Sequence, residues 1–344
     1  MKLSGIDRYL WVCIIVVALH LIVGVWASAI YPMPIGQDYK WHRSLVQAIV
    51  ERGPSAIVDR VFLSAGEMPY PPLYHFLFVL PVYLGYQDLF GRILQVFLFS
   101  ATLSVLILVA YRWGGGSYYA MCTALFLASG VGFWDRGFQV APQGFEMLFL
   151  AVAIWAFLGE HPVAFVLSAL GMVYMHAPVA WILLAPFFVL VLLFRAKESC
   201  WILSLFGIFL GSIPLAMFLA PYAVSATVKH SGLLSAQKAF MYSRPILFTV
   251  LYLGPAFILT AHFLLRLRWH KLWDLHKLMA VLAVSLLALL PLWADRALGY
   301  AVMPLSFLIP FAMGESKRGW MLVVVAFAVW GVLVKFLMVP VMDV

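Results

Sequence analysis

Charged residues are scarce in this chain, and their scarcity excludes a water-soluble fold. Only 10% of the 344 residues are Asp, Glu, Lys or Arg, whereas 65% are hydrophobic. That is more apolar surface than a soluble core of this size can bury. Runs of about 20 apolar residues recur between short polar breaks, and each is long enough to cross a bilayer as a helix. The sequence therefore predicts an all-α polytopic membrane protein.

Cysteine is also rare, which argues against a disulfide framework or a zinc site. The three cysteines, Cys13, Cys122 and Cys200, lie within apolar segments and show no paired spacing. We expect them to be small packing residues. The sequence shows no internal repeat and no low-complexity linker, so we expect a single transmembrane domain over residues 1–344.

The positive charges predict the orientation of this domain. Lys and Arg number 22 against 14 Asp and Glu, a net charge of +8. In a membrane protein such an excess points to the positive-inside rule before it points to nucleic acid, and we expect no nucleic-acid partner. With a cytoplasmic N-terminus and about eleven spans, one side collects Lys2, Arg8, Arg112, Arg195, Lys197, Arg266, Arg268, Lys271, Lys277, Lys317 and Arg318. We predict a multi-pass protein of the plasma membrane.

This topology depends on how residues 69–86 are interpreted. Their apolar stretch is short and contains Pro81, which favours a half-inserted helix that returns to the outer side. If the segment crossed fully, every later span would invert, and the basic run 266–277 would lie outside. We therefore predict four parts: an outer first loop at 32–88 with an amphipathic and a re-entrant helix, central spans at 89–220, a second outer loop at 221–245 and C-terminal spans at 246–344.

Polar residues at the outer ends of spans are candidates for function, because ionisable groups near a bilayer core are costly. The competing interpretation is that they cap helices or reach into the headgroups. Both interpretations apply to Asp38. It directly follows the first span and opens the helix predicted over 38–52, so it suits an N-cap as well as a general base toward an acceptor hydroxyl.

Several outer elements occur in an order that resembles a known superfamily. They are Asp38, the helix that ends before Gly53, the Tyr-Pro-Pro-Leu-Tyr-His box at 70–75, Gly91-Arg92, and Arg296-x-x-x-Tyr300-x-x-x-Pro304. In this order they resemble integral membrane glycosyltransferases of the GT-C type. That group includes protein O-mannosyltransferases, aminoarabinose transferases and oligosaccharyltransferases. The resemblance covers about residues 5–180 and, more loosely, the region of Arg296.

The resemblance implies an inverting transfer of a sugar from a polyprenyl-phosphate-linked donor to an acceptor hydroxyl of a glycan, lipid or protein at the outer face. Asp38 takes the position of the catalytic acid of the first loop, with Glu146 as the second choice. Arg296 takes the position of a cation that faces the donor phosphate. A guanidinium can bind phosphate through two hydrogen bonds. His75, Lys229 and Lys238 are further phosphate candidates. The candidate residues of the substrate cavity are Tyr39, His42, Tyr70, Asp135, Arg136, Gln143, His176 and Tyr300.

The chain departs from the GT-C pattern at several positions. Asp38 is followed by Tyr39 where many members have Glu, and Tyr70 replaces a Lys that often precedes the Pro-Pro pair. No Asp-x-Asp motif lies within 135–146, which disfavours a tightly bound divalent metal without excluding one, and the sequence indicates no other cofactor. The large outer C-terminal domain of the oligosaccharyltransferases is missing.

Two other functions fit the same sequence. A transporter or lipid-handling protein would use the outer polar residues to line a pathway, and His20, His262 and the prolines within spans are compatible with that. A non-catalytic subunit of a membrane complex would explain the 13 Trp and 15 Tyr as interfacial residues.

Overall fold

A computed structural model describes residues 7–30, 39–58, 71–130, 141–243, 274–288, 290–313, 329 and 331. Within these ranges the regular structure is entirely helical, with ten α-helices and one short 3-10 helix. The side chains of 222–243 and 290–298 are outside the description, although their backbone is helical. The prediction of an all-α fold is confirmed for the part of the chain that the structure describes.

Three of these helices are long and apolar enough to cross a membrane. They are α1 (Arg8–Ile30), α4 (Gln87–Trp113) and the first part, Ser199–Pro221, of α9 (Ser199–Ser243). Further apolar helices are α3 (Pro72–Tyr83), α5 (Ser117–Ser129), α7 (Pro142–Leu158) and α13 (Leu290–Met313). The other described elements are α8 (Pro162–Phe194), α12 (Asp274–Ala288), the polar α2 (Tyr39–Arg52) and the 3-10 helix η2 (Pro54–Val58). These helices indicate a membrane-embedded protein; the total of eleven spans stays a prediction.

Large apolar side chains cover the outer surface of these helices, as expected where lipid is the solvent. Ile22 of α1, Leu193 of α8 and Met217 of α9 are all strongly exposed. A soluble monomer rarely carries apolar patches this extensive. The exposed and buried surfaces of the helices are therefore similarly apolar, and the buried side is marked instead by its polar side chains.

The helix α8 is a hairpin of two shorter helices. The rings of Phe165 and Phe187 lie 5.4 Å apart, whereas 22 residues of straight helix would separate them by about 33 Å. The reversal falls at His176, whose backbone is non-helical (φ −154°, ψ 66°). Pro178 follows two residues later and cannot donate the backbone N–H that would bond the carbonyl of Tyr174. The sequence prediction of separate spans that meet at His176 agrees with this geometry.

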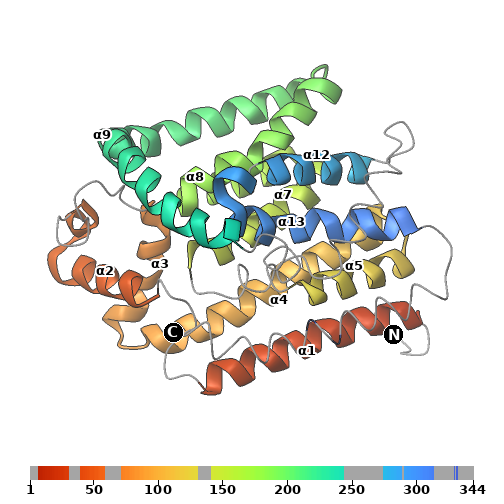
Figure 1. Cartoon of the computed structure of the whole chain (residues 1–344), viewed down its shortest axis with the longest axis horizontal. Coiled ribbons are helices and arrows are strands. Elements are labelled where there is room, and N and C mark those ends of the chain that lie inside the picture. Colours follow the sequence, from red (N-terminus) through yellow and green to blue (C-terminus); the bar gives the residue numbers. More distant parts are fainter. Residues whose placement is uncertain are drawn as a thin grey trace.

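Successive long helices run in opposite directions between two ends of the bundle. Gln95 of α4 donates a hydrogen bond to Ser28 near the end of α1, and Ser117, which opens α5, bonds Asp7 just before α1. The starts of α5 and α12 meet where Tyr119 bonds His276. Figure 1 shows the N-terminus at one end of the bundle and α2 and α3 at the other.

We call the end of the bundle that carries the N-terminus the basic end, because its helix ends and turns carry five of the nine described Lys and Arg side chains. Arg195, in the turn after α8, lies 3.3 Å from Glu160 in the turn before it, and Lys277 of α12 lies over the ring of Phe194. We call the opposite end, which carries α2 and α3, the α2–α3 end. The described residues at the basic end include Arg8, Arg112, Arg195, Lys197 and Lys277.

The helix α3 begins and ends at the α2–α3 end. Its first turn contacts α2 through a 3.0 Å hydrogen bond between His42 and His75. After α3, the chain turns at Gly85 (φ +75°) and enters α4, where Asp88 accepts a 2.8 Å hydrogen bond from Tyr39. Tyr39 and His42 are one helical turn apart, so the first turn of α3 and the start of α4 lie beside the same turn of α2. With 12 residues, α3 is about 18 Å long and too short to cross a bilayer core of about 30 Å.

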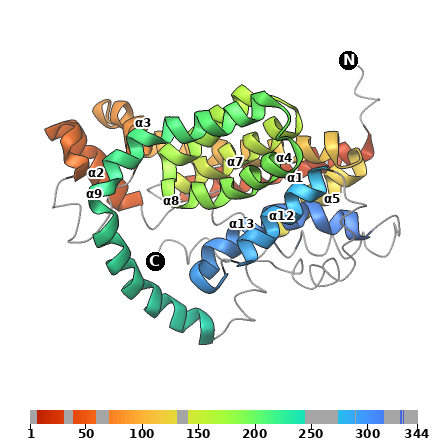
Figure 2. The same ribbon diagram turned by 90° about the horizontal axis from the view of Figure 1, so that it is seen from above.

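Two polar segments lie within helices. Residues 221–243, the first part of the predicted second outer loop, continue α9 as far as Ser243, while the candidate span within α9 ends at Pro221. Their location outside the membrane stays a prediction. Pro214 and Pro221 lie inside this helix, and Figure 2 shows that it curves away from the bundle; a proline can bend a helix without ending it. Arg296 stands between two apolar runs, which predicts a turn between two spans, but it lies within the helix α13. Hydropathy alone does not mark the end of either helix.

The position of α3 leads to a test of topology by cysteine labelling. In a background with Cys200→Ser, we expect Lys40→Cys and Tyr86→Cys to react with a membrane-impermeant maleimide from the same side. Lys197→Cys should react only from the opposite side, because five apolar helical segments of the described chain separate it from Tyr86: α4, α5, α7 and the two halves of α8. Labelling of right-side-out and inverted vesicles is the measurement. Reaction of Lys40→Cys and Tyr86→Cys from opposite sides would show that α3 crosses the membrane.

Candidate functional site

A buried carboxylate, Glu146, lies near the start of α7 at the α2–α3 end of the bundle. Its side chain is fully buried. The hydroxyl of Tyr300 on α13 donates a hydrogen bond to Oε2, and Nδ1 of His176 lies 3.2 Å from the same oxygen. In the part of the chain that the structure describes, Oε1 has no hydrogen-bond partner. Glu146 thus has one oxygen held by two side chains and one that is unpaired.

The three residues of this cluster come from helices far apart in the sequence. His176 reaches Glu146 because the hairpin of α8 reverses at that residue. Tyr300 reaches it because α13 packs closely against α5: Val302 occupies the space that a side chain at Gly130 would need. Glu146, His176 and Tyr300 were all predicted site residues, and the structure brings them into direct contact.

Gln143 lies one turn before Glu146 on α7 and faces the same region. It is 4% exposed, and within the described part of the chain its Oε1 has no hydrogen-bond partner. Residues three apart on a helix are neighbours on its surface, with Cβ atoms about 5–6 Å apart. The helix therefore carries two buried and unpaired acceptor oxygens on side chains one turn apart.

A buried pair of histidines lies next to this cluster. His42 on α2 and His75 on α3 are 1% and 0% exposed, and Nδ1 of His42 is 3.0 Å from Nε2 of His75. One of the two rings donates this hydrogen bond, so the pair is most stable with at least one neutral ring. Tyr74 packs on His42 and on Phe145 of α7, which connects the pair to the carboxylate site.

Burial lowers the pKa of His42 well below its ordinary value, and the nearby His75 and His176 lower it further. Burial and the neighbouring Asp88 raise the pKa of Tyr39. Both residues are therefore held in their neutral forms at pH 7. The surface helix α2 presents neutral hydrogen-bonding groups toward the bundle.

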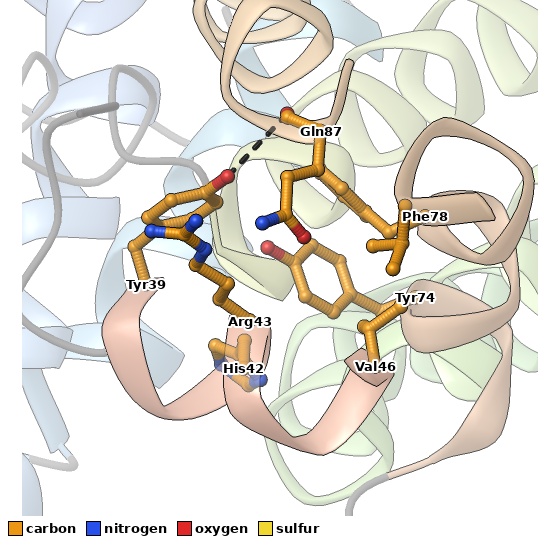
Figure 3. A pocket seen from close by; sticks show the side chains of 8 residues that line it. Tyr39, His42, Arg43, Val46, Tyr74, Phe78 and Gln87 are labelled. Carbon is orange, nitrogen blue, oxygen red and sulfur yellow. Dashed lines mark hydrogen bonds between the residues drawn. The ribbon is translucent and has the colours of Figure 1, made fainter. Parts of the chain in front are cut away.

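A small pocket lies between α2, α3 and the start of α4, with about 200 Å³ of empty space counting its open mouth. Figure 3 shows Arg43 beside Tyr39 and Gln87, with Phe78 and Val46 among its apolar walls. Arg43 lies 3.5 Å from Asp88. Turned with its amide oxygen toward the guanidinium, Gln87 accepts a 2.9 Å hydrogen bond from Nη2 of Arg43.

Arg43, Gln87 and Asp88 were not among the predicted site residues. One sequence signal could have indicated Arg43, since it lies four residues after Tyr39 and next to His42 on a helix with a polar face. Nothing local indicated that the start of α4 would complete the pocket, because its position depends on the return of the chain after α3.

The other predicted site residues lie beyond what the structure describes. Asp38, Tyr70, Asp135 and Arg136 fall outside the described residues. Lys229 and Lys238 on α9, and Arg296 on α13, lie in helices whose backbone is described but whose side chains at these positions are not. Their roles stay predictions.

Among the described residues, no three His, Cys, Asp or Glu side chains are grouped in a way that could hold a metal ion. The chain matches no model of a known protein family, and no curated protein matches it. The glycosyltransferase resemblance therefore rests on the order of the sequence elements.

Removing the hydroxyl that holds Glu146 should destabilise the fold. We expect Tyr300→Phe to lower the free energy of unfolding by about 1–3 kcal/mol, because a buried carboxylate loses a donor. The midpoint of thermal unfolding in detergent is the measurement. Tyr86→Phe is the control, since Tyr86 is 63% exposed and should keep the wild-type midpoint. Equal midpoints for Tyr300→Phe and wild type would contradict the structural role of this bond.

The lowered pKa of His42 predicts how stability depends on pH. Below pH of about 6.5 the unfolded chain binds a proton at His42 that the folded protein does not. Unfolding therefore becomes easier as the pH falls from about 7 to about 5, by up to about 1.4 kcal/mol per pH unit from this residue. We expect His42→Gln to show a shallower loss of thermal stability over this range. The exposed His161 provides the control variant His161→Gln, and identical slopes for His42→Gln and wild type would contradict the prediction.

Proposed function

We propose that this protein is a membrane glycosyltransferase that moves a sugar from a polyprenyl-phosphate-linked donor to an acceptor hydroxyl at the extracytoplasmic face of the plasma membrane. The observation that carries the proposal is the Glu146 carboxylate, held on one oxygen by Tyr300 and His176 and unpaired on the other. A general base needs this combination of fixed geometry and an available oxygen.

The proposed orientation follows the positive-inside prediction of the sequence, with the basic end in the cytoplasm. Among the described cations the difference is small, because five lie at the basic end and Lys40, Arg43, Arg52 and Arg92 lie at the α2–α3 end. The cluster of Glu146, His176 and Tyr300 then faces the extracytoplasmic side, together with α2 and α3. Asp38 directly precedes α2 in the sequence, so the first-choice acid of the sequence analysis belongs to this side as well.

The proposed reaction is a single displacement at the anomeric carbon. The acceptor oxygen forms a bond to that carbon while the bond from the carbon to the phosphate oxygen breaks, and the configuration inverts. The acceptor proton passes to the base, Asp38 or Glu146, and the electron pair of the broken bond leaves with the polyprenyl phosphate. Stabilisation of that developing charge requires cations, for which Arg296, Lys229 and Lys238 are the candidates and Arg43 is an addition. Burial lowers the pKa of the predicted phosphate ligand His75 to about 4, so His75 could act only as a neutral hydrogen-bond donor.

The apolar surface of α3 fits a lipid-linked donor. Leu80 and Tyr83 are 64% and 76% exposed on a helix that is too short to cross the bilayer. An apolar, aromatic surface at the edge of the membrane is suited to contact a prenyl chain while the phosphate stays near the polar groups of α2.

Transfer from a synthetic polyprenyl-phosphate sugar in reconstituted vesicles tests the proposal. With native membrane extract as acceptor source, we expect Glu146→Gln or Asp38→Asn to reduce the release of polyprenyl phosphate at least about 100-fold, since a general base contributes about 10²–10⁴. Glu160→Gln is the matched control, because Glu160 is a largely exposed carboxylate at the basic end. Full activity in both Glu146→Gln and Asp38→Asn would overturn the proposed mechanism.

A carrier function is the second candidate, favoured by one observation. Buried ionisable residues beside a break in a helix, such as Glu146 and His176, also occur where transporters bind coupling ions. The break in α8 is a hairpin turn rather than an interruption within one span, which favours chemistry at the surface of the membrane. Net solute uptake into protein-containing vesicles without donor lipid, lost in Glu146→Gln, would favour the carrier.

A further inference from the structure

Two unpaired oxygens lie one turn apart near the start of α7. Gln143 Oε1 and Glu146 Oε1 are both buried, and neither has a partner among the described residues. A buried acceptor without a donor costs free energy relative to an apolar atom of the same shape. Single oxygens of this kind also occur at Ser100 and Thr123, but here two of them belong to the cluster of the candidate base.

We propose that Gln143 and Glu146 bind two hydroxyl groups of a neutral sugar, and that the acceptor of the proposed transferase is therefore a carbohydrate. This inference rests on the proposed function. One hydroxyl donates to Oε1 of Glu146 and is the one that reacts, and a second hydroxyl of the same molecule donates to Gln143. Gln143 is accordingly a positioning residue that sets which hydroxyl reaches the base.

The chemistry of the two oxygens selects against other ligands. A phosphate or carboxylate would place negative charge against two acceptor oxygens, so an anionic acceptor is disfavoured. A metal ion would need more oxygen or nitrogen ligands than the described residues provide. The charge on Glu146 is already shared by the hydrogen bonds of Tyr300 and His176, and Gln143 is neutral. A neutral ligand with two neighbouring O–H donors fits this pair best.

Burial of the pair is consistent with an acceptor site. Gln143 is 4% and Glu146 0% exposed, so water reaches neither oxygen freely. Water competes with the acceptor in every sugar transfer, and a site that excludes it prevents hydrolysis of the donor.

Binding measured without any donor tests the inference separately from transfer. The probes are methyl α-mannopyranoside, inorganic phosphate and methylammonium, and the readout is saturation-transfer NMR on protein in nanodiscs. We expect the glycoside to bind wild type and to bind Gln143→Met about tenfold more weakly, since one hydrogen bond is lost. Glu146→Gln has a single oxygen, which would accept from Tyr300 and leave an N–H donor toward the sugar, so this variant should also weaken glycoside binding. Thr123→Val is the control, because its buried hydroxyl also has no partner among the described residues but lies on α5.

Stability provides a second readout that a purely structural Gln143 would move in the opposite direction. Without ligand, Gln143→Met should raise the midpoint of thermal unfolding, because an unpaired buried oxygen is replaced by an apolar group of similar length. A lowered midpoint with unchanged glycoside binding would overturn the inference, as would tighter binding of phosphate or methylammonium than of the glycoside. Glycoside binding that requires Gln143, in a protein that transfers no sugar, would reject the proposed function and leave the binding site.

Discussion

The hydrogen bonds to the Glu146 carboxylate connect the helices that form the candidate site. They join α7 to the turn of α8 and to α13, and a buried carboxylate is tolerated in an apolar bundle only when such donors hold it. Because lipid surrounds an apolar exterior, polar contacts rather than hydrophobicity fix how these helices face one another. Loss of the Tyr300 or His176 contact would therefore change both the packing and the candidate site.

The second constraint is the return of the chain between α1 and α4. The first turn of α3 and the start of α4 lie beside the first turn of α2, through the bonds of His42 to His75 and of Tyr39 to Asp88. The chain thus enters α4 at the end where it left α1. This return places α2, α3 and the start of α7 at one end of the bundle, while the cations of the turns collect at the other.

Much of the helical framework could be predicted from the sequence, because apolar length, prolines and glycines act locally. Apolar run length predicts spans at about 89–111, 117–133 and 143–158, and the starts of α4, α5 and α7 fall within two residues of these. Apolar runs on both sides of His176 likewise predict two spans that meet there. Polarity did not mark the end of a helix, however: 221–243 continues α9, and Arg296 lies within α13. A helix at the edge of a membrane can be polar, so hydropathy does not mark its end.

The sequence by itself determined the class of the protein and the residues that could do chemistry, since composition and apolar run length depend on no distant contact. Only the tertiary structure decided which of those residues meet. Glu146, His176 and Tyr300 are separated by up to 154 positions, and no local pattern indicates that they share one hydrogen-bond cluster. The sequence also does not indicate that the unpaired oxygens of Gln143 and Glu146 are both buried, because burial is set by the helices that pack against α7.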